Sequence, residues 1–131
     1  MDVEALAAAE RCTAGSDAGT MAFPEVIAAM IASGLERYHA DLVRAEKIWF
    51  LPDGRSQTLT CDPLIVPPAM PFDAAGVAAA VRDAQAGAIN YHGFCAAIAT
   101  AGCVGYLVSI PGRRVVYYGR TAETHVELFP D

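Results

Sequence analysis

Two residues near the end of the chain, His125 and Glu127, have types and a spacing that could support acid–base chemistry. They lie two positions apart in the stretch HVELF, and side chains two apart on a β-strand point to the same face. An imidazole beside a carboxylate can exchange protons near neutral pH if both line a cleft. The pattern also fits a solvated strand face with Val126 and Leu128 pointing inward, and we favour that interpretation.

A second candidate for catalysis is Cys95, which follows His92 by three residues and could act as a nucleophile with His92 as its base. Side chains at this spacing meet on one helix face, and the N-terminal end of a helix favours a thiolate. A nucleophilic cysteine is therefore one interpretation. The other is packing, because the aligned position in the first half of the chain holds Ile27. No common phosphate, zinc or hydrolase motif occurs, and we expect no metal and no cofactor.

Aromatic residues on two expected strands are candidate binding residues. WF at Trp49 and Phe50 and YY at Tyr117 and Tyr118 are adjacent pairs, so each strand sends one aromatic ring to each face of a sheet. Outward-facing rings can form a ligand platform or a partner surface. Helices on both sides could equally cover them.

Polar candidates lie on the same expected strands and turns. Arg113, Arg114 and Arg120 gather at the ends of one hairpin, where they could hold a carboxylate or a phosphate, although a solvated turn also accounts for them. His39 and Asp41 repeat the spacing of two on an earlier strand. For that pair we expect an exposed polar face.

The elements that must position these residues follow a pattern that occurs twice. FPEVIAAMIASG, from Phe23, aligns without a gap with YHGFCAAIATAG, from Tyr91, and KIWFL then falls on VVYYG. Apolar residues in the second stretch recur at helical spacing, and Gly34 and Gly102 are suited to end the two helices. Asn90 is a candidate N-cap.

After each glycine the period changes from helical to alternating, which predicts three antiparallel strands per half. An earlier helix in each half runs from a capping acid, Asp2 or Asp73, to Gly15 or Gly87. We therefore expect an α+β single domain, 1–131, of two ααβββ repeats, about 2–61 and 74–130. A proline-rich linker, 62–73, joins them. Helices should cover the antiparallel sheet, or sheets if the halves do not share one.

Composition bounds the class of protein. The chain has 131 residues, of which 54% are hydrophobic and 18% charged, which predicts a folded domain. Its net charge of −6 disfavours nucleic acid and anionic membranes as partners. The acidic N-terminal segment does not resemble a targeting signal, and no run of about 18 apolar residues occurs. We expect a cytoplasmic protein whose four cysteines are reduced and mostly buried.

Several of these stretches carry a family resemblance. QAGAINYHGFCAAIATAGCVGYLV, followed by RRVVYYG and HVELFP, resembles the C-terminal half of the bacterial and prophage-borne family called domain of unknown function 1398. FPEVIAAMIASGLERYHADLV is similar to the first half of that family. Members are sometimes labelled phage envelope proteins, a role that these residues do not support. The resemblance implies a soluble bacterial domain without an established activity or catalytic residues.

Two functions follow as hypotheses. The first is a non-enzymatic module that binds a small molecule or a protein through its strand surface or an unpaired sheet edge, with a homodimer as one arrangement. The second is a metal-independent enzyme that uses His125 and Glu127 as an acid–base pair and an arginine as an anion clamp. A deep pocket would favour the enzyme and a flat aromatic patch the module.

Overall fold

Ten elements build the protein in the computed structural model, which describes residues 1–130. They are α1 (Val3–Ala18), α2 (Phe23–Ser33), β1 (Arg37–Asp41), β2 (Glu46–Phe50), β3 (Ser56–Thr60), α3 (Ala74–Gln85), α4 (Tyr91–Thr100), β4 (Cys103–Ser109), β5 (Arg114–Gly119) and β6 (Thr124–Leu128). The expected α+β class is confirmed.

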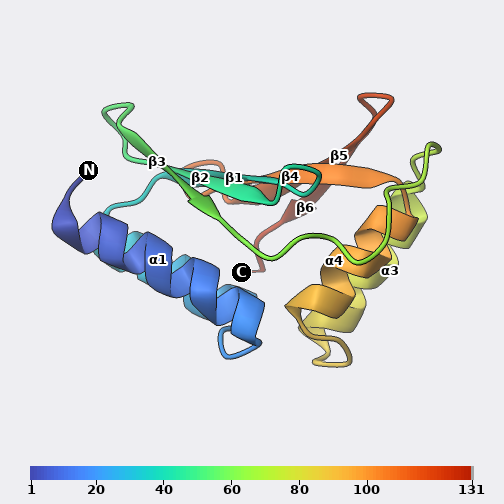
Figure 1. Cartoon of the computed structure of the whole chain (residues 1–131), viewed down its shortest axis with the longest axis horizontal. Helices are drawn as coiled ribbons and strands as arrows, with labels where there is room; N and C mark the ends of the chain where they lie inside the picture. The colour runs from blue at the N-terminus through green and yellow to red at the C-terminus, as the bar shows by residue number, and fades with distance from the viewer. Residues whose placement is uncertain (131) are drawn as a thin grey trace.

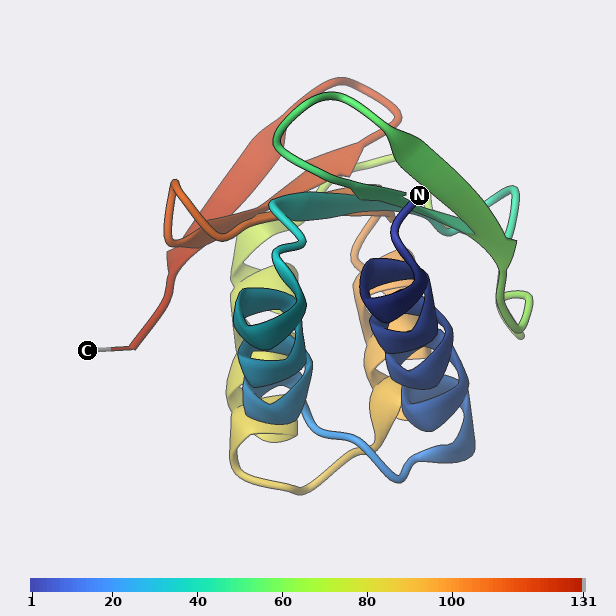
Figure 2. The same ribbon diagram turned by 90° about the vertical axis from the view of Figure 1, so that its left-hand side faces the viewer.

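All six strands belong to one antiparallel sheet with the order β3-β2-β1-β4-β5-β6. The two halves therefore share a single sheet, a point that the sequence left open. The four helices lie on one face of this sheet, and its other face carries no helix (Figures 1 and 2). None of the described helices has the length and hydropathy needed to cross a bilayer.

Most helix ends follow local sequence signals. The expected cap Asp2 is an exception, because its side chain makes no capping hydrogen bond and instead accepts one from Arg55. The Asn90 side chain accepts a hydrogen bond from the Gly93 N–H at 2.9 Å and so caps α4 as expected. The expected end of α1 at Gly15 is wrong, because the helix continues to Ala18 and ends where Gly19 adopts φ 71°. Gly15 instead gives the Met21 side chain room to pack, since a Cβ would lie 2.5 Å from Met21 Cγ.

The core lies between the helices and the inward-facing side chains of the sheet. Trp49 is fully buried, and its ring stacks on that of Tyr38 with 4.2 Å between centroids. Tyr117 is buried on the same face. The expected alternation is confirmed, because Phe50 and Tyr118 are only half-buried on the other face. Trp49 and Tyr117 are therefore core residues, and their assignment as surface binding residues is wrong.

The two halves meet at the centre of the sheet, where β1 pairs with β4. Tyr38 lies opposite Val108 and Ala40 opposite Tyr106. The hydroxyls of Tyr38 and Tyr106, which are 68 positions apart in the sequence, lie 3.3 Å from each other. The element order ααβββ thus occurs twice around this junction. That the halves are copies of one repeated unit stays a prediction.

The linker, 62–73, contains no helix or strand, and backbone hydrogen bonds hold it against α4. The Ala69 N–H donates to the Ala99 carbonyl at 2.9 Å, and the Asp73 N–H donates to the Ala101 carbonyl at 2.7 Å. Gly102 follows this helix with φ 89°, and a Cβ there would overlap the Pro71 carbonyl oxygen. The linker can therefore pack this closely against the end of α4 because residue 102 is a glycine.

Gly102→Ala is expected to lower the free energy of unfolding by about 3 kcal/mol, because it adds a backbone clash to a strained positive φ. Urea denaturation followed by circular dichroism measures the loss. Gly54→Ala is the matched control, since Gly54 has φ 92° but a Cβ at this residue would meet no atom within 4 Å. The control should lose only about 1 kcal/mol. Equal losses in both variants would contradict a linker held rigidly at Gly102.

Candidate functional site

A buried polar cluster around Lys47 occupies the space between the sheet and the first turn of α4. Lys47 is the only lysine in the sequence, and just 1% of its surface is exposed. Its Nζ lies 4.3 Å from the centroid of the Tyr91 ring and 5.6 Å from that of Tyr38. Within residues 1–130, the Lys47 ammonium forms no ion pair. Aromatic faces, and not a carboxylate, are therefore its closest favourable partners.

Three tyrosines form a hydrogen-bonded chain beside this amine. The Tyr91 hydroxyl lies 2.8 Å from the Tyr106 hydroxyl, which in turn lies 3.3 Å from that of Tyr38. Burial raises the pKa of each of the three phenols above its ordinary value. The three hydroxyls consequently stay protonated near neutral pH, and each can donate or accept a hydrogen bond with its neighbour.

Burial controls the ionisation of Lys47 and of the neighbouring thiols. It lowers the pKa of Lys47, although the nearby Cys61, Cys95 and Asp17 act in the opposite direction. It raises the pKa of Cys95 to about 11, so this thiol is protonated at neutral pH. Desolvation thus outweighs the position of Cys95 near the start of α4, which favours the packing interpretation over a nucleophilic thiolate. The site contains neutral thiols beside an amine with an increased neutral fraction.

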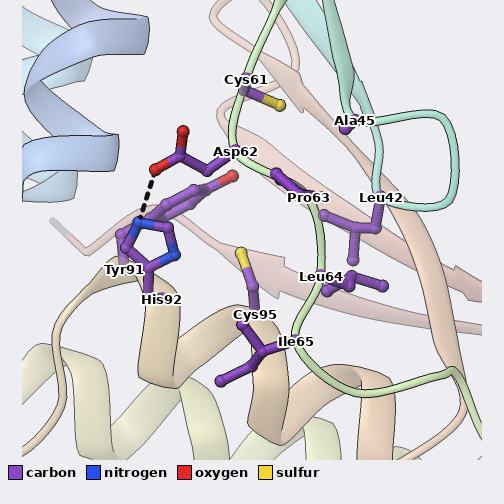
Figure 3. Close-up of a pocket in the computed structure, with 10 residues that line it drawn as sticks. All are labelled: Leu42, Ala45, Cys61, Asp62, Pro63, Leu64, Ile65, Tyr91, His92 and Cys95. Atoms are coloured by element: carbon purple, nitrogen blue, oxygen red, sulfur yellow. Dashed lines mark ion pairs between the residues drawn. The ribbon is translucent and has the colours of Figure 1, made fainter.

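A small cavity lies beside the cluster, where the start of the linker passes the first turn of α4 (Figure 3). Its volume of about 20 Å³ gives room for about one water molecule. The lining residues come from the β1–β2 turn, the residue after β3, the linker and α4: Leu42, Ala45, Cys61, Asp62, Pro63, Leu64, Ile65, Tyr91, His92 and Cys95. Two of the expected catalytic candidates, His92 and Cys95, are thus brought to one cavity.

Polar contacts at the rim of this cavity join three distant segments. His92 Nε2 lies 3.0 Å from Asp62 Oδ2, as drawn in Figure 3, and 2.9 Å from the Asp17 carbonyl oxygen. The Asp62 N–H donates to Asp17 Oδ2 at 3.1 Å, while Asp17 Oδ1 is buried without a hydrogen-bond partner. By residue type these three side chains could ligate a divalent cation. Their mutual hydrogen bonds also fasten α1 and the linker to α4.

The His125 and Glu127 pair forms, but on the opposite face from the one expected. His125 Nε2 lies 2.8 Å from Glu127 Oε1, and both side chains are half-buried on the helix-covered face beside Tyr117. Val126 and Leu128 instead point outward and are 43% and 65% exposed. The correction has a simple cause: His125 pairs with Tyr117 across β5 and β6, and paired residues share a face.

His39 and Asp41 lie half-buried on the face of β1 that no described helix covers, and they act separately. His39 Nε2 lies 2.8 Å from the Tyr118 hydroxyl, and the two rings stack at a centroid distance of 5.8 Å. Asp41 Oδ1 accepts hydrogen bonds from the N–H groups of Val43 and Arg44 and so closes the β1–β2 turn. His39 with Tyr118 is the pair that this surface presents.

The three candidate arginines do not form one positive spot. Arg114 begins β5, whereas Arg120 follows its last residue, so the two lie at opposite ends of the strand. Arg114 Nε donates to the Gly112 carbonyl at 3.0 Å, and the Arg113 guanidinium lies 5.9 Å from the Phe129 ring centroid. The three arginines therefore do not act together on one anion, because the length of β5 separates Arg120 from the other two.

Sequence reasoning missed Lys47, Asp17 and Asp62. For Lys47 a signal existed, because the alternation that points Trp49 inward also points Lys47 inward, and a single lysine in such a position is unusual. For Asp17 and Asp62 no local signal existed. They lie at the end of α1 and at the start of the linker, and only the fold brings them to His92.

The helix-free face of the sheet is a second candidate surface, which we call the open face. Its apolar side chains lie on four of the six strands: Ile48, Phe50, Leu107, Val116, Val126 and Leu128. No described helix covers this face (Figure 2), on which Val126 and Leu128 are exposed and the other four side chains are half-buried. A face of this kind is typical of a docking surface.

The fold and these two sites define a two-layer α+β protein with a buried lysine cluster below its sheet and an apolar face above it. Residues 16–127 match the family model described as Protein of unknown function (DUF1398), so the chain belongs to this family. The resemblance drawn from the sequence is thereby confirmed. No curated protein matches the chain.

Proposed function

We propose that this protein is an interaction module that docks a second copy of itself on the open face. The observation that carries the proposal is the one-sided cover of the sheet. Val126 and Leu128, 43% and 65% exposed, continue an apolar surface that runs through Leu107 and Val116 at the centre of the face. Burying such a surface against a partner removes apolar area from water and stabilises the complex.

The charges of the open face favour a second copy as the occupant. Arg37 and Arg114 lie at one end of the strands, because both flank Ser109 in neighbouring ladders. Asp41 and Glu46 lie opposite each other in the ladder at the other end, where Arg44 forms an ion pair with Glu46 and Asp41 stays without one among the described residues. A two-fold axis across the strands would place the basic end of one copy over the acidic end of the other. The face is therefore self-complementary, as an isologous dimer requires.

The cytoplasm is the proposed location of this dimer, and we propose no nucleic-acid or membrane partner. All four cysteines are free thiols, which fits a reducing compartment. The net charge of −6 repels phosphate backbones and anionic lipid surfaces on average.

Light scattering coupled to size exclusion tests the dimer. We expect twice the mass of the chain for the wild type, and a monomer for the double variant Val126→Arg, Leu128→Arg, because two charges would be desolvated in the interface. Ile31→Arg is the matched control, since Ile31 is 62% exposed on α2, away from the open face. The control should remain dimeric. A wild type that is monomeric over a wide concentration range would refute the proposal.

A metal-independent enzyme is the second candidate. The 2.8 Å contact between His125 and Glu127 favours it, since a carboxylate that orients an imidazole supports general acid–base catalysis. Both side chains are half-buried against Tyr117, and neither lines the cavity beside α4. For that reason we rank the enzyme below the interaction module.

A further inference from the structure

We propose that the two copies of the dimer meet with His39 against His39 of the second copy, and that the dimer dissociates at mildly acidic pH for this reason. The inference rests on the proposed function, because it concerns how the second copy lies on the open face. It adds the register of the interface and a condition that opens it.

The open face consists of rows of residues that run across the strands, because residues paired in neighbouring ladders share a face. The row through the middle of the face, which we call the middle row, has one residue from each strand: Thr58, Ile48, His39, Leu107, Val116 and Val126. One flanking row contains Arg37 and Arg114, and the other contains Asp41 and Glu46. Of the six residues in the middle row, only His39 can change its charge.

The charges of the two flanking rows determine where the two-fold axis lies. The basic row of one copy comes over the acidic row of the other only if the axis runs along the middle row, midway between them. A half-turn about this line lays β1 over β1 of the second copy, since aligned packing keeps strand directions within about 30° of each other. Arg37 then lies over Asp41 of the second copy. Each residue of the middle row, His39 included, lies over its own counterpart.

The His39 imidazole is held against the open face by a neighbouring aromatic ring. His39 Nε2 lies 2.8 Å from the Tyr118 hydroxyl, and the two rings stack at 5.8 Å between centroids. Tyr118 reaches this position across β4 at Gly105, where a Cβ would overlap its hydroxyl. His39 is already half-buried in a single copy, between Ile48 and Leu107 in the middle row. A second copy would therefore bury the imidazole in apolar surroundings.

The carboxylates of the open face are already engaged and do not neutralise a protonated His39. Asp41 accepts hydrogen bonds from two N–H groups of the β1–β2 turn, and Glu46 is paired with an arginine of that turn. His39 itself forms no ion pair with any described residue. Arg37 and Arg114, in the row on its other side, add positive charge. Protonation of both copies would thus set two cations against each other where water is excluded.

Proton binding at His39 is consequently favoured in the monomer over the dimer, and linkage makes the dissociation constant depend on pH. Histidine ordinarily gains its proton at about pH 6.5. Two such groups that take up a proton only in the monomer raise the Kd by about 100-fold between pH 7.5 and pH 5.5. The dimer is therefore expected to be stable above this range and to be lost as the pH falls through it.

Sedimentation equilibrium of the full chain at pH 7.5 and at pH 5.5 tests the inference. We expect a dimer at pH 7.5 whose Kd is about 100-fold higher at pH 5.5, with an unchanged far-ultraviolet circular dichroism spectrum. A chain that is monomeric at both pH values would refute the proposed dimer itself. A dimer with the same Kd at both pH values would refute only the role of His39. Loss of the dichroism signal at pH 5.5 would assign the dissociation to unfolding and overturn the inference.

Two glutamine variants separate His39 from the other two histidines of the chain. His39→Gln keeps a polar side chain that cannot gain a charge, and its Kd should be equal at the two pH values. His92→Gln is the matched control, because His92 lies on α4 in the helical layer, away from the open face. The control should keep the pH dependence of the wild type. A pH dependence that persists in His39→Gln would overturn the inference.

Two charge reversals test the register without a change of pH. Arg37→Glu sets carboxylates over each other in the proposed dimer, and Asp41→Lys sets cations over each other, so each variant alone should be monomeric at pH 7.5. An equal mixture of the two variants should form a heterodimer, because the reversed charges then lie over each other, as do the two unchanged ones. A mixture that stays monomeric would refute a two-fold axis along the middle row.

Discussion

Trp49→Ala is expected to lower the free energy of unfolding by about 4 kcal/mol, a large part of the total stability of a domain of this size. Trp49 is fully buried, and its ring stacks on Tyr38, its partner across the β1–β2 ladder. Removing the indole takes away both the buried area and the aromatic contact, and it leaves a cavity. Urea denaturation followed by far-ultraviolet circular dichroism measures the change.

Two further substitutions sharpen this test. Trp49→Phe should cost much less, about 1.5 kcal/mol, because Trp49 Nε1 has no hydrogen-bond partner to lose. Phe50→Ala, on the same strand but on the open face, should cost about 1 kcal/mol in the monomer. If Trp49→Ala cost no more than Phe50→Ala, the indole would not be a core residue.

Lys47→Met is expected to raise the free energy of unfolding at neutral pH by about 2 kcal/mol. The methionine side chain has nearly the same length and removes a cationic group that is buried without a carboxylate partner. Lys47→Arg, which cannot lose its proton, is the contrasting variant and should be destabilised. A loss of stability in Lys47→Met would show that the contacts of the ammonium with Tyr38 and Tyr91 outweigh its desolvation.

The increase in the free energy of unfolding in Lys47→Met should depend on pH, and the burial of Lys47 determines the sign of this dependence. Because its folded-state pKa is lowered, the unfolded chain binds more protons at this site between the folded and the ordinary pKa. The stability that this site contributes is present above the ordinary pKa and is lost as pH falls through the folded one. The advantage of Lys47→Met therefore grows toward acidic pH and shrinks toward about pH 10.

Denaturation of both proteins between pH 6 and pH 8 measures this difference. Cys95 acts in the opposite direction, because burial raises its pKa from 9.0 to about 11 and its contribution is lost as pH rises through that range. The Lys47 ammonium also lowers the pKa of Cys95, so this loss is larger in Lys47→Met, and the two proteins are compared below about pH 8, where Cys95 stays protonated in both. A difference that stays constant with pH would mean that Lys47 titrates at its ordinary value.

Local signals in the sequence predicted most of the elements, because each change from helical to alternating period marks a change of structure. They failed where a contact with a distant part of the sequence determines where an element ends or which face it presents. Gly15 was expected to end a helix, but it lies within α1 because Met21 packs against it. Alternation placed His125 and Glu127 on one face of β6, but only the pairing with β5 determines which face that is.

The candidate site was harder to predict than the elements, because contacts between distant segments assemble it. His92 and Cys95 were identified from their helical spacing, and both line the cavity. The cation that gives the site its chemistry, Lys47, comes from a strand of the other half. Its burial depends on the helices that cover β2, which no short stretch of sequence encodes.

The β1–β4 ladder also has a consequence for the order of folding events. Among the described strands it is the only pairing between the halves, and it brings together residues such as Tyr38 and Tyr106 that are 68 positions apart. The other ladders connect strands that follow one another directly, so they close short loops at low entropic cost. We therefore expect each half to assemble its three-stranded meander first, and the joining of the two meanders to limit the folding rate. A cut in the linker would then turn this slow step into a bimolecular association of two fragments.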